Sequence, residues 1–232
     1  MSQTETTDKN FVTIIKILQE HNIKHWIGQG TLLGIIRDGK LIEWDHDIDI
    51  CLWPEEIEKE KVVNILKKNN FIYRDDLTFG EKYDQLSFDK AGGRRIDINF
   101  YHRIKLKNGK IIASIKVGYP RNKFMSLIDA ISLIEDYNGK YKKIIKKLKF
   151  LQKLSIFIKN FLIKNKLFFK SAGYMQPIEL LQDFKEISFN GLKLRIPSLT
   201  EQYLNHVYGN DWRVPLKKFS WWKMKNINTY YD

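Results

Sequence analysis

The hydrophobic and polar positions of the first fifty residues alternate between helical and strand spacing. Residues 23–27 are typical of a short strand that runs into a turn containing Gly28 and Gly30, and an apolar helix follows and stops near Gly39. Residues 44–53 have the alternation of a second strand. Before these, a first amphipathic helix is predicted from apolar residues that recur at helical spacing: Phe11, Ile14, Ile15 and Leu18.

The next eighty residues continue the mixture of helix and strand. Pro54, followed by two acidic residues, has the look of a helix's first turn, and the apolar positions of 57–66 supply its buried stripe. The turn residues Asn108 and Gly109 predict a hairpin. Further strands are expected at 71–73, 86–88 and 95–101. The pattern predicts an α/β (α+β) domain, a mixed sheet flanked by helices.

The second half changes character at Tyr141. Apolar residues there recur near the helical period with lysines between them, which predicts one long or two short basic helices. A hairpin at Asn190 and Gly191, a helix over 199–208 and an aromatic tail follow. We therefore expect three parts: a catalytic core over 1–136, a basic amphipathic helical segment over 137–172, and a C-terminal helical, aromatic-rich segment over 173–232 that packs on the core.

Composition narrows the class of protein. A chain of 232 residues with 43% hydrophobic content can bury a substantial core. Cys51 is the single cysteine, so no internal disulfide can form, and no apolar run near Met1 resembles a signal peptide. These features favour a cytoplasmic protein.

The net charge of +13 indicates an anionic partner, and much of it is local. No acidic residue lies between Asp136 and Glu179, where lysines are frequent. Two interpretations of this basic segment stay open: helices with an apolar face packed on the domain and lysines in water, or peripheral attachment at the inner face of an anionic cytoplasmic membrane. Lysines interrupt the segment too often for it to span a bilayer.

The strongest chemical signal joins Gly30 and Thr31 to Asp47 and Asp49 farther along the chain. A helix N-terminus offers unpaired N–H groups to a phosphate, and a glycine permits close approach. Two aspartates on one strand face can hold Mg²⁺ or Mn²⁺ against substrate phosphates. We therefore predict a metal–phosphate site.

A third carboxylate is expected from Asp97, which lies between Ile96 and Ile98 on a later strand. Its neighbours Arg94 and Arg95 could contact phosphate. An Asp-x-Asp pattern alone is most often a solvated strand face, so the prediction rests on the whole combination. His102 is a weaker candidate for assisting proton transfer.

These motifs together resemble a known family, that of LicD and fukutin. The family has a glycine-threonine turn, an arginine and a tryptophan-led aspartate cluster, and its closing segment is similar to residues 189–215 of this chain. The matching positions are Gly30-Thr31-Leu32-Leu33-Gly34, Arg37, Trp44-Asp45, Asp47-Ile48-Asp49-Ile50 and Arg95-Ile96-Asp97-Ile98. His46 stands where many relatives carry another acid, which leaves the roles of Asp45 and His46 less defined.

The resemblance implies a nucleotidyltransferase fold. It also implies transfer of phosphocholine, ribitol phosphate or a related group from a CDP-linked donor to a hydroxyl of a cell-surface glycan or its lipid-linked precursor. The residue roles carried over by position make Asp47, Asp49 and Asp97 the catalytic, metal-binding residues. They make Gly30, Thr31, Arg37 and Arg95 the donor-binding residues.

Two other functions remain open. The same metal site could serve a nucleotidyltransferase that consumes a nucleoside triphosphate and releases pyrophosphate. A basic membrane- or nucleic-acid-binding module with an inactive site is the non-enzymatic alternative. It is disfavoured because the glycine turn and all three aspartates are present and no nucleic-acid motif accompanies the charge.

Overall fold

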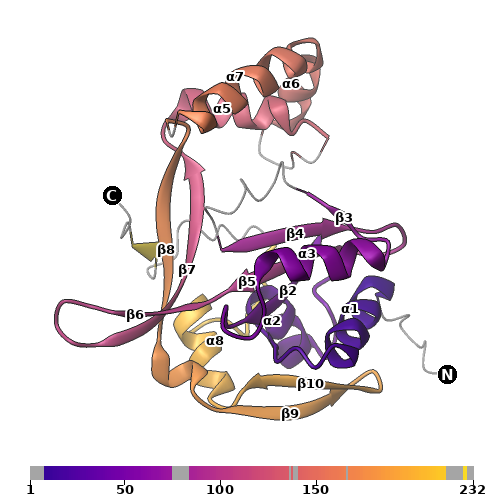
Figure 1. Ribbon diagram of the computed structural model, residues 1–232, viewed down its shortest axis with the longest axis vertical. Helices are drawn as coiled ribbons and strands as arrows, with labels where there is room; N and C mark the ends of the chain where they lie inside the picture. The colour runs from indigo at the N-terminus through magenta and orange to yellow at the C-terminus, as the bar shows by residue number, and fades with distance from the viewer. Residues whose placement is uncertain are drawn as a thin grey trace. The chain divides into compact units, whose positions relative to one another are not determined.

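The computed structural model describes residues 8–74, 84–135, 137, 141–165, 167–217 and 227–228. The chain forms two compact units, one of Met1–Val117 with Gly173–Asn228 and one of Gly118–Ala172 with Thr229–Asp232. Figure 1 shows the order of the elements along the chain. The first unit contains every residue of the predicted site.

A five-stranded mixed sheet forms the centre of the first unit, with strand order β1-β2-β5-β4-β3. β2 and β5 are parallel, and the other neighbours are antiparallel. The strands span Trp26–Ile27 (β1), Asp47–Leu52 (β2), Ile72–Tyr73 (β3), Gln85–Asp89 (β4) and Arg95–Phe100 (β5). The predicted strand over 44–53 therefore begins later, at Asp47, and Asp45 lies in the segment that leads into it.

Three helices pack against this sheet: α1 (Lys9–Glu20), α2 (Gln29–Asp38) and α3 (Lys59–Lys68). α2 ends as predicted at Gly39, whose φ of 67° is readily adopted by glycine. The prediction that a helix begins at Pro54 is wrong, because the Glu56 N–H donates to the Trp53 carbonyl and closes a turn there. α3 starts only after this turn.

A cluster of aromatic rings lies in the core beneath β1. The Trp26 ring centroid lies 5.2 Å from Trp53, 5.5 Å from Tyr101 and 5.1 Å from Phe184. Trp26 and Tyr101 are fully buried. Since Phe184 comes from the last third of the chain, the core ties the C-terminal segment to the sheet.

That segment contains the predicted hairpin of β9 (Phe184–Phe189) and β10 (Leu192–Pro197), followed by α8 (Thr200–Tyr208). Asn190 and Gly191 have φ values of 48° and 76°, as a two-residue hairpin turn requires. A short 3-10 helix, Ile178–Leu181 (η3), precedes the hairpin. β10 lies beside β1, and α8 lies beside α2.

A second sheet of four strands has the order β11-β8-β7-β6. Its strands are β6 (His102–Lys105), β7 (Ile111–Pro120), β8 (Phe169–Pro177) and β11 (Ile227–Asn228). The predicted hairpin at Asn108 and Gly109 joins β6 to β7. The predicted helical segment extends to residue 172, but β8 already begins at Phe169, because pairing within this sheet outweighs the local helical pattern.

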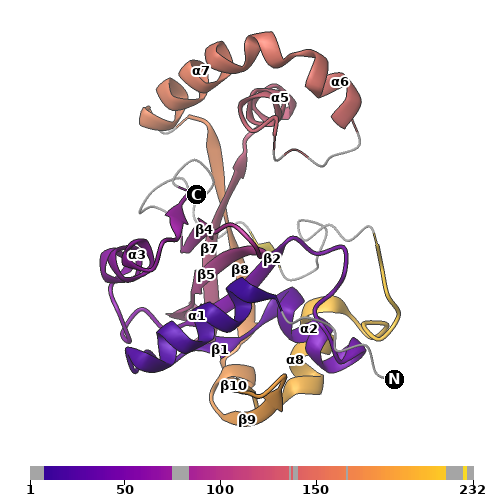
Figure 2. The ribbon, with the colours of Figure 1, turned by 90° about the vertical axis from the view of Figure 1, so that its right-hand side faces the viewer.

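The second unit contains α5 (Lys123–Ser132), α6 (Lys142–Lys147), a 3-10 turn over Lys149–Leu151 (η2) and α7 (Gln152–Lys164). Figure 2 shows α6 and α7 following one another beside α5. α5 packs on α7, so it belongs with the second unit although the predicted core extended to residue 136. The division into three functional parts stays a prediction. Among the described helices, none is long and apolar enough to cross a bilayer.

Candidate active site

The parallel pairing of β2 with β5 brings the predicted carboxylates together. In its register Asp49 lies opposite Asp97, and Asp47 lies opposite Arg95. Alternate residues of a strand share a face, and directly paired residues on neighbouring strands project to the same side. The structure therefore brings Asp47, Asp49 and Asp97 to one side of the sheet, although Asp49 and Asp97 are about fifty residues apart in sequence.

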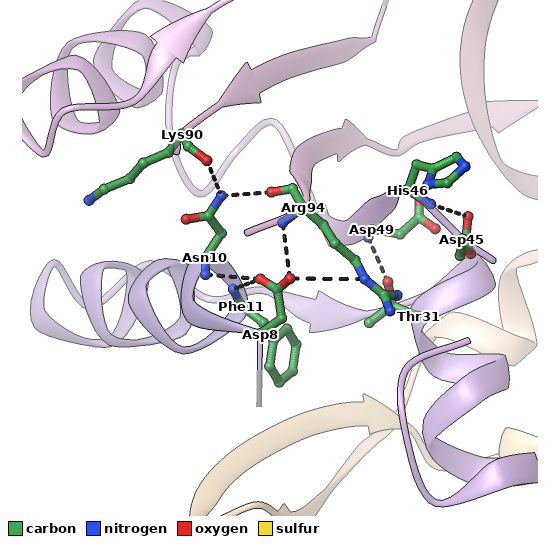
Figure 3. A network of polar contacts seen from close by, with 9 residues as sticks. All are labelled: Asp8, Asn10, Phe11, Thr31, Asp45, His46, Asp49, Lys90 and Arg94. Atoms are coloured by element: carbon green, nitrogen blue, oxygen red, sulfur yellow. Dashed lines mark hydrogen bonds and ion pairs between the residues drawn. The ribbon is translucent and has the colours of Figure 1, made fainter. Parts of the chain in front are cut away.

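Asp49 is held by hydrogen-bond partners from two elements. Its Oδ2 accepts the Gly30 N–H at 3.1 Å, and its Oδ1 accepts from Asn99 Nδ2 at 3.2 Å. Its own N–H donates to the Thr31 hydroxyl at 2.8 Å, a contact drawn in Figure 3. The carboxylate is 8% exposed. Its orientation is thus determined by α2 and β5.

Asp97 is equally constrained by the neighbouring strand β4. The Ser87 hydroxyl donates to Oδ1 at 2.6 Å, and Gln85 Nε2 donates to Oδ2 at 2.7 Å. The side chain is 6% exposed. With both oxygens hydrogen-bonded, the carboxylate is preorganised.

Burial and mutual repulsion disfavour the charged forms of these groups. Burial, followed by the charge of Asp47, raises the pKa of Asp97 to about 7 and that of Asp45 to about 7. Burial, with the charges of Asp47, Asp45 and Asp97, also raises the pKa of Asp49 well above its ordinary value. A cluster of carboxylates with raised pKa values is a place where a cation would be strongly favoured.

The start of α2 is fitted closely to this cluster. A Cβ on Gly30 would lie 2.6 Å from Asp45 Oδ2 and 3.5 Å from Asp49 Oδ2, so only glycine leaves room there. The Gln29 N–H donates to the Tyr203 hydroxyl at 3.2 Å. Tyr203 lies on α8 and is fully buried, so the C-terminal segment helps to position the glycine turn.

The predicted donor-binding residues have protein partners in this structure. Thr31 is buried, and its hydroxyl accepts from β2. Arg37 makes two bonds to Asp38, at 2.8 and 2.7 Å, and Arg95 Nε donates to Asp89 at 3.1 Å. Their contacts with a donor, like that of Gly30, stay predictions.

Arg94 and Asp8 form an arrangement that the sequence did not reveal. The Asp8 carboxylate caps α1 and accepts the Arg94 N–H at 3.0 Å, while Arg94 Nε lies 3.9 Å from the same oxygen (Figure 3). Asn10 Nδ2 donates to the Arg94 carbonyl at 2.8 Å. The charge of Arg94 lowers the pKa of Asp45 and partly opposes the effect of burial, so Arg94 acts electrostatically on the carboxylate cluster.

Other residues show where sequence reasoning stopped. His102 Nε2 lies 3.0 Å from Asp84 Oδ1, so its carboxylate partner is Asp84 and not the predicted Asp97. Asn99 was missed, although it follows Asp97 by two positions and therefore shares its strand face. Ser87, Gln85 and Tyr203 carry no sequence signal for their roles, because their partners lie on other elements.

The donor chemistry of the cluster fits a hard divalent cation. Mg²⁺ in phosphoryl-transfer sites is commonly bound by one or two carboxylates, with water and substrate phosphates completing its shell. Asp47 and Asp49 can supply two carboxylates from one strand face, and Asp97 can supply a third. Over the described residues, no three His, Cys, Asp or Glu side chains are already arranged to hold a metal ion.

Parts of this chain are similar in sequence to curated proteins. An uncharacterized protein of Rickettsia typhi, RT0683, is 32% identical over 93 residues, which are 40% of this chain and 27% of that protein. Ribitol 5-phosphate transferase FKRP of Homo sapiens is 32% identical over 44 residues, 19% of this chain and 9% of that protein. The aligned segments thus span about a quarter or less of these relatives.

Among solved structures, the lincomycin-bound lincosamide antibiotic adenylyltransferase LnuA aligns with 86% of this chain and 85% of its own, at a TM-score of 0.43 and 14% identity.

The family comparison covers the segment that builds the site. Residues 22–129 match the sequence profile described as LicD/FKTN/FKRP, nucleotidyltransferase domain. This range contains the glycine turn of α2, the aspartates of β2 and Asp97 on β5. Over this stretch, a little under half of the chain, the protein is therefore similar to the nucleotidyltransferase domain of the LicD/FKTN/FKRP family.

Proposed function

We propose that this protein is a metal-dependent transferase of a phospho-linked group. The group is phosphocholine, ribitol phosphate or a similar one, the donor is CDP-linked, and the acceptor is a hydroxyl of a cell-surface glycan or its lipid-linked precursor. The observation that carries the proposal is the pairing of Asp49 with Asp97 beside the Gly30 N–H. FKRP, a relative over part of the chain, is named as a ribitol 5-phosphate transferase.

The metal would be held by Asp47 and Asp49, with Asp97 as the third carboxylate. When bound, Mg²⁺ or Mn²⁺ would neutralise charge on the donor phosphates and on the departing nucleotide. Burial and then the repulsion between carboxylates raise the pKa values of Asp49 and Asp97, and such a cation would relieve the repulsion. Metal binding would therefore also stabilise the fold.

Asp97 is the proposed acceptor of the proton from the attacking hydroxyl. Ser87 and Gln85 hold its two oxygens in place, which orients the carboxylate for proton transfer. The hydroxyl oxygen forms a bond to the β-phosphorus as the bond from that phosphorus to the CMP oxygen breaks. CMP leaves with the bonding electron pair.

Two arginine side chains, Arg94 and Arg37, are proposed to contact the donor phosphates. Arg94 influences Asp45 electrostatically and is held by Asp8. Arg37 would have to exchange part of its pairing with Asp38 for a phosphate, which a bidentate guanidinium can do. The N-terminus of α2 adds the positive end of its dipole.

The test compares donors and products. Thermal shift with CDP-choline, CDP-ribitol, CDP-glycerol and nucleoside triphosphates, each with and without Mg²⁺, identifies the donor class, because a ligand that binds only the folded state raises the Tm. We expect a Mg²⁺-dependent shift with a CDP-linked donor and release of CMP. A shift with triphosphates alone, with release of pyrophosphate, would identify a nucleotidyltransferase instead.

Two variants distinguish loss of the site from loss of the fold. Asp49→Ala should abolish CMP release and the Mg²⁺-dependent shift while the protein still folds. Glu20→Ala, which removes an exposed carboxylate at the end of α1, is the matched control and should retain both. An active Asp49→Ala protein would contradict the assignment.

A further inference from the structure

The second unit exposes large apolar side chains along one line. Phe150 in η2 is 80% exposed, and in α7 Leu154, Phe157 and Phe161 are 54%, 70% and 59% exposed. Their spacing of four, three and four residues places them on one side of a helix. We call these four residues the apolar stripe.

The side of α7 that packs on α5 is polar at its most buried positions. Ser155 and Lys159 are the residues of α7 that are buried, and Lys159 Nζ lies 2.9 Å from Asp129 of α5. In an ordinary surface helix the most apolar side faces the domain. α7 differs from the expected inward apolar face with lysines in water, because the stripe is exposed and Lys159 is buried, although Lys153 and Lys164 are exposed.

The surface around the stripe is mainly basic. Residues 137–178 contain no acid, and Lys149 is paired with Glu135 at 2.6 Å. Exposed lysines occur on both helices: Lys143, Lys146, Lys147, Lys153 and Lys164. An exposed apolar stripe with lysines beside it is the arrangement of a helix that lies in a membrane interface.

We propose that η2 and α7 dock this unit on the surface of an anionic phospholipid bilayer. The stripe enters the boundary between headgroups and acyl chains, and the lysines contact lipid phosphates. A bilayer fits better than a protein partner, because an apolar line in a mainly basic surface matches an extended anionic plane. The proposal does not depend on the proposed reaction and is tested without turnover.

The first arm of the test is co-sedimentation with vesicles of phosphatidylglycerol and phosphatidylcholine, compared with vesicles of phosphatidylcholine alone. The full chain should bind the anionic vesicles at least about tenfold more tightly. Phe157→Ser with Phe161→Ser should weaken this binding about tenfold or more without lowering the Tm, since both rings are already exposed. Ile72→Ser, at another exposed apolar residue in the first unit, should have no effect.

The second arm removes charge. Lys143, Lys146 and Lys147 changed together to Gln should weaken binding by about fivefold for each lysine near the surface. The matched control removes the same charge from the β6–β7 hairpin by changing Lys105, Lys107 and Lys110 to Gln, and should bind as the wild type does. An equal loss in the hairpin variant would overturn the proposal, since binding would then follow net charge alone.

Three further results would also overturn it. One is equal binding to both kinds of vesicle. Another is a dimer in light scattering that Phe157→Ser with Phe161→Ser converts to a monomer while vesicle binding persists, which would make a second copy the occupant. The last is retention on nucleic acid that depends on the lysines, with no binding to vesicles.

Discussion

Asp49 on β2 lies directly opposite Asp97 on β5, and burial raises the pKa of both carboxyl groups. Each is fully supplied with hydrogen-bond donors, from Gly30 and Asn99 in one case and Ser87 and Gln85 in the other. The site therefore keeps its acids in place despite their repulsion. We expect such a site to bind a divalent cation.

The first prediction concerns pH. The pKa values of Asp45 and Asp97 are raised to about 7 in the folded state, whereas an unfolded aspartate has a pKa of about 3.9. Between about pH 4 and 7 the folded state thus binds more protons at these groups, and their contribution to stability falls as pH rises. In EDTA, Asp45→Asn should flatten the fall in Tm over this range, and Mg²⁺ should raise the wild-type Tm at pH 7.5 or above. Identical Tm profiles for wild type and variant would contradict this.

Gly30→Ala should disturb the site more than the helix. Alanine normally stabilises a helix by up to about 1 kcal/mol relative to glycine, but this Cβ would lie 2.6 Å from Asp45 Oδ2. We expect turnover to fall about tenfold or more and the Tm to fall slightly. Adding Asp45→Ala should restore the Tm, which a double-mutant cycle in thermal unfolding measures. Additive effects would show that the two residues do not interact.

Tyr203→Phe tests the link between α8 and the glycine turn. The ring stays buried, but the Gln29 N–H loses its acceptor, at a cost of about 1–3 kcal/mol. Because Gln29 directly precedes Gly30, turnover should decrease along with stability. Parallel measurement of kcat/KM and chemical denaturation checks this. Unchanged kcat/KM with reduced stability would reduce Tyr203 to a packing role.

Asp8→Ala tests the support of Arg94. Asp8 accepts from Asn10 N and Phe11 N as the cap of α1, so its loss should cost about 0.5–2 kcal/mol. It should also raise the KM for the donor, because Arg94 is no longer oriented. Asn122→Ala removes the cap of α5, which accepts from Met125 N, and is the matched control. An equal KM change in both variants would exclude a role for Arg94 through Asp8.

Much of the local structure followed from the sequence alone. Alternation in residues 44–53 predicted one strand with Asp45, Asp47 and Asp49 on one side, since side-chain direction in a strand depends only on position; the strand itself begins at Asp47. The turns at Gly39, Gly109 and Gly191 were also predictable, because each needs a positive φ that glycine adopts readily. The family motif likewise lies in contiguous residues, and its assignment was confirmed.

Tertiary structure decided which residues meet. Strand order and register place Asp97 against Asp49. Packing gives Arg95 its partner Asp89 and Asp8 its contact with Arg94. Tertiary structure also decided which side of α7 is buried. The helical period of α7 was visible in the sequence, but its contact with α5, which includes the ion pair of Lys159 with Asp129, was not. Sequence determines periodicity and turn chemistry because these depend on neighbouring residues, whereas register and facing depend on packing between segments far apart in the chain.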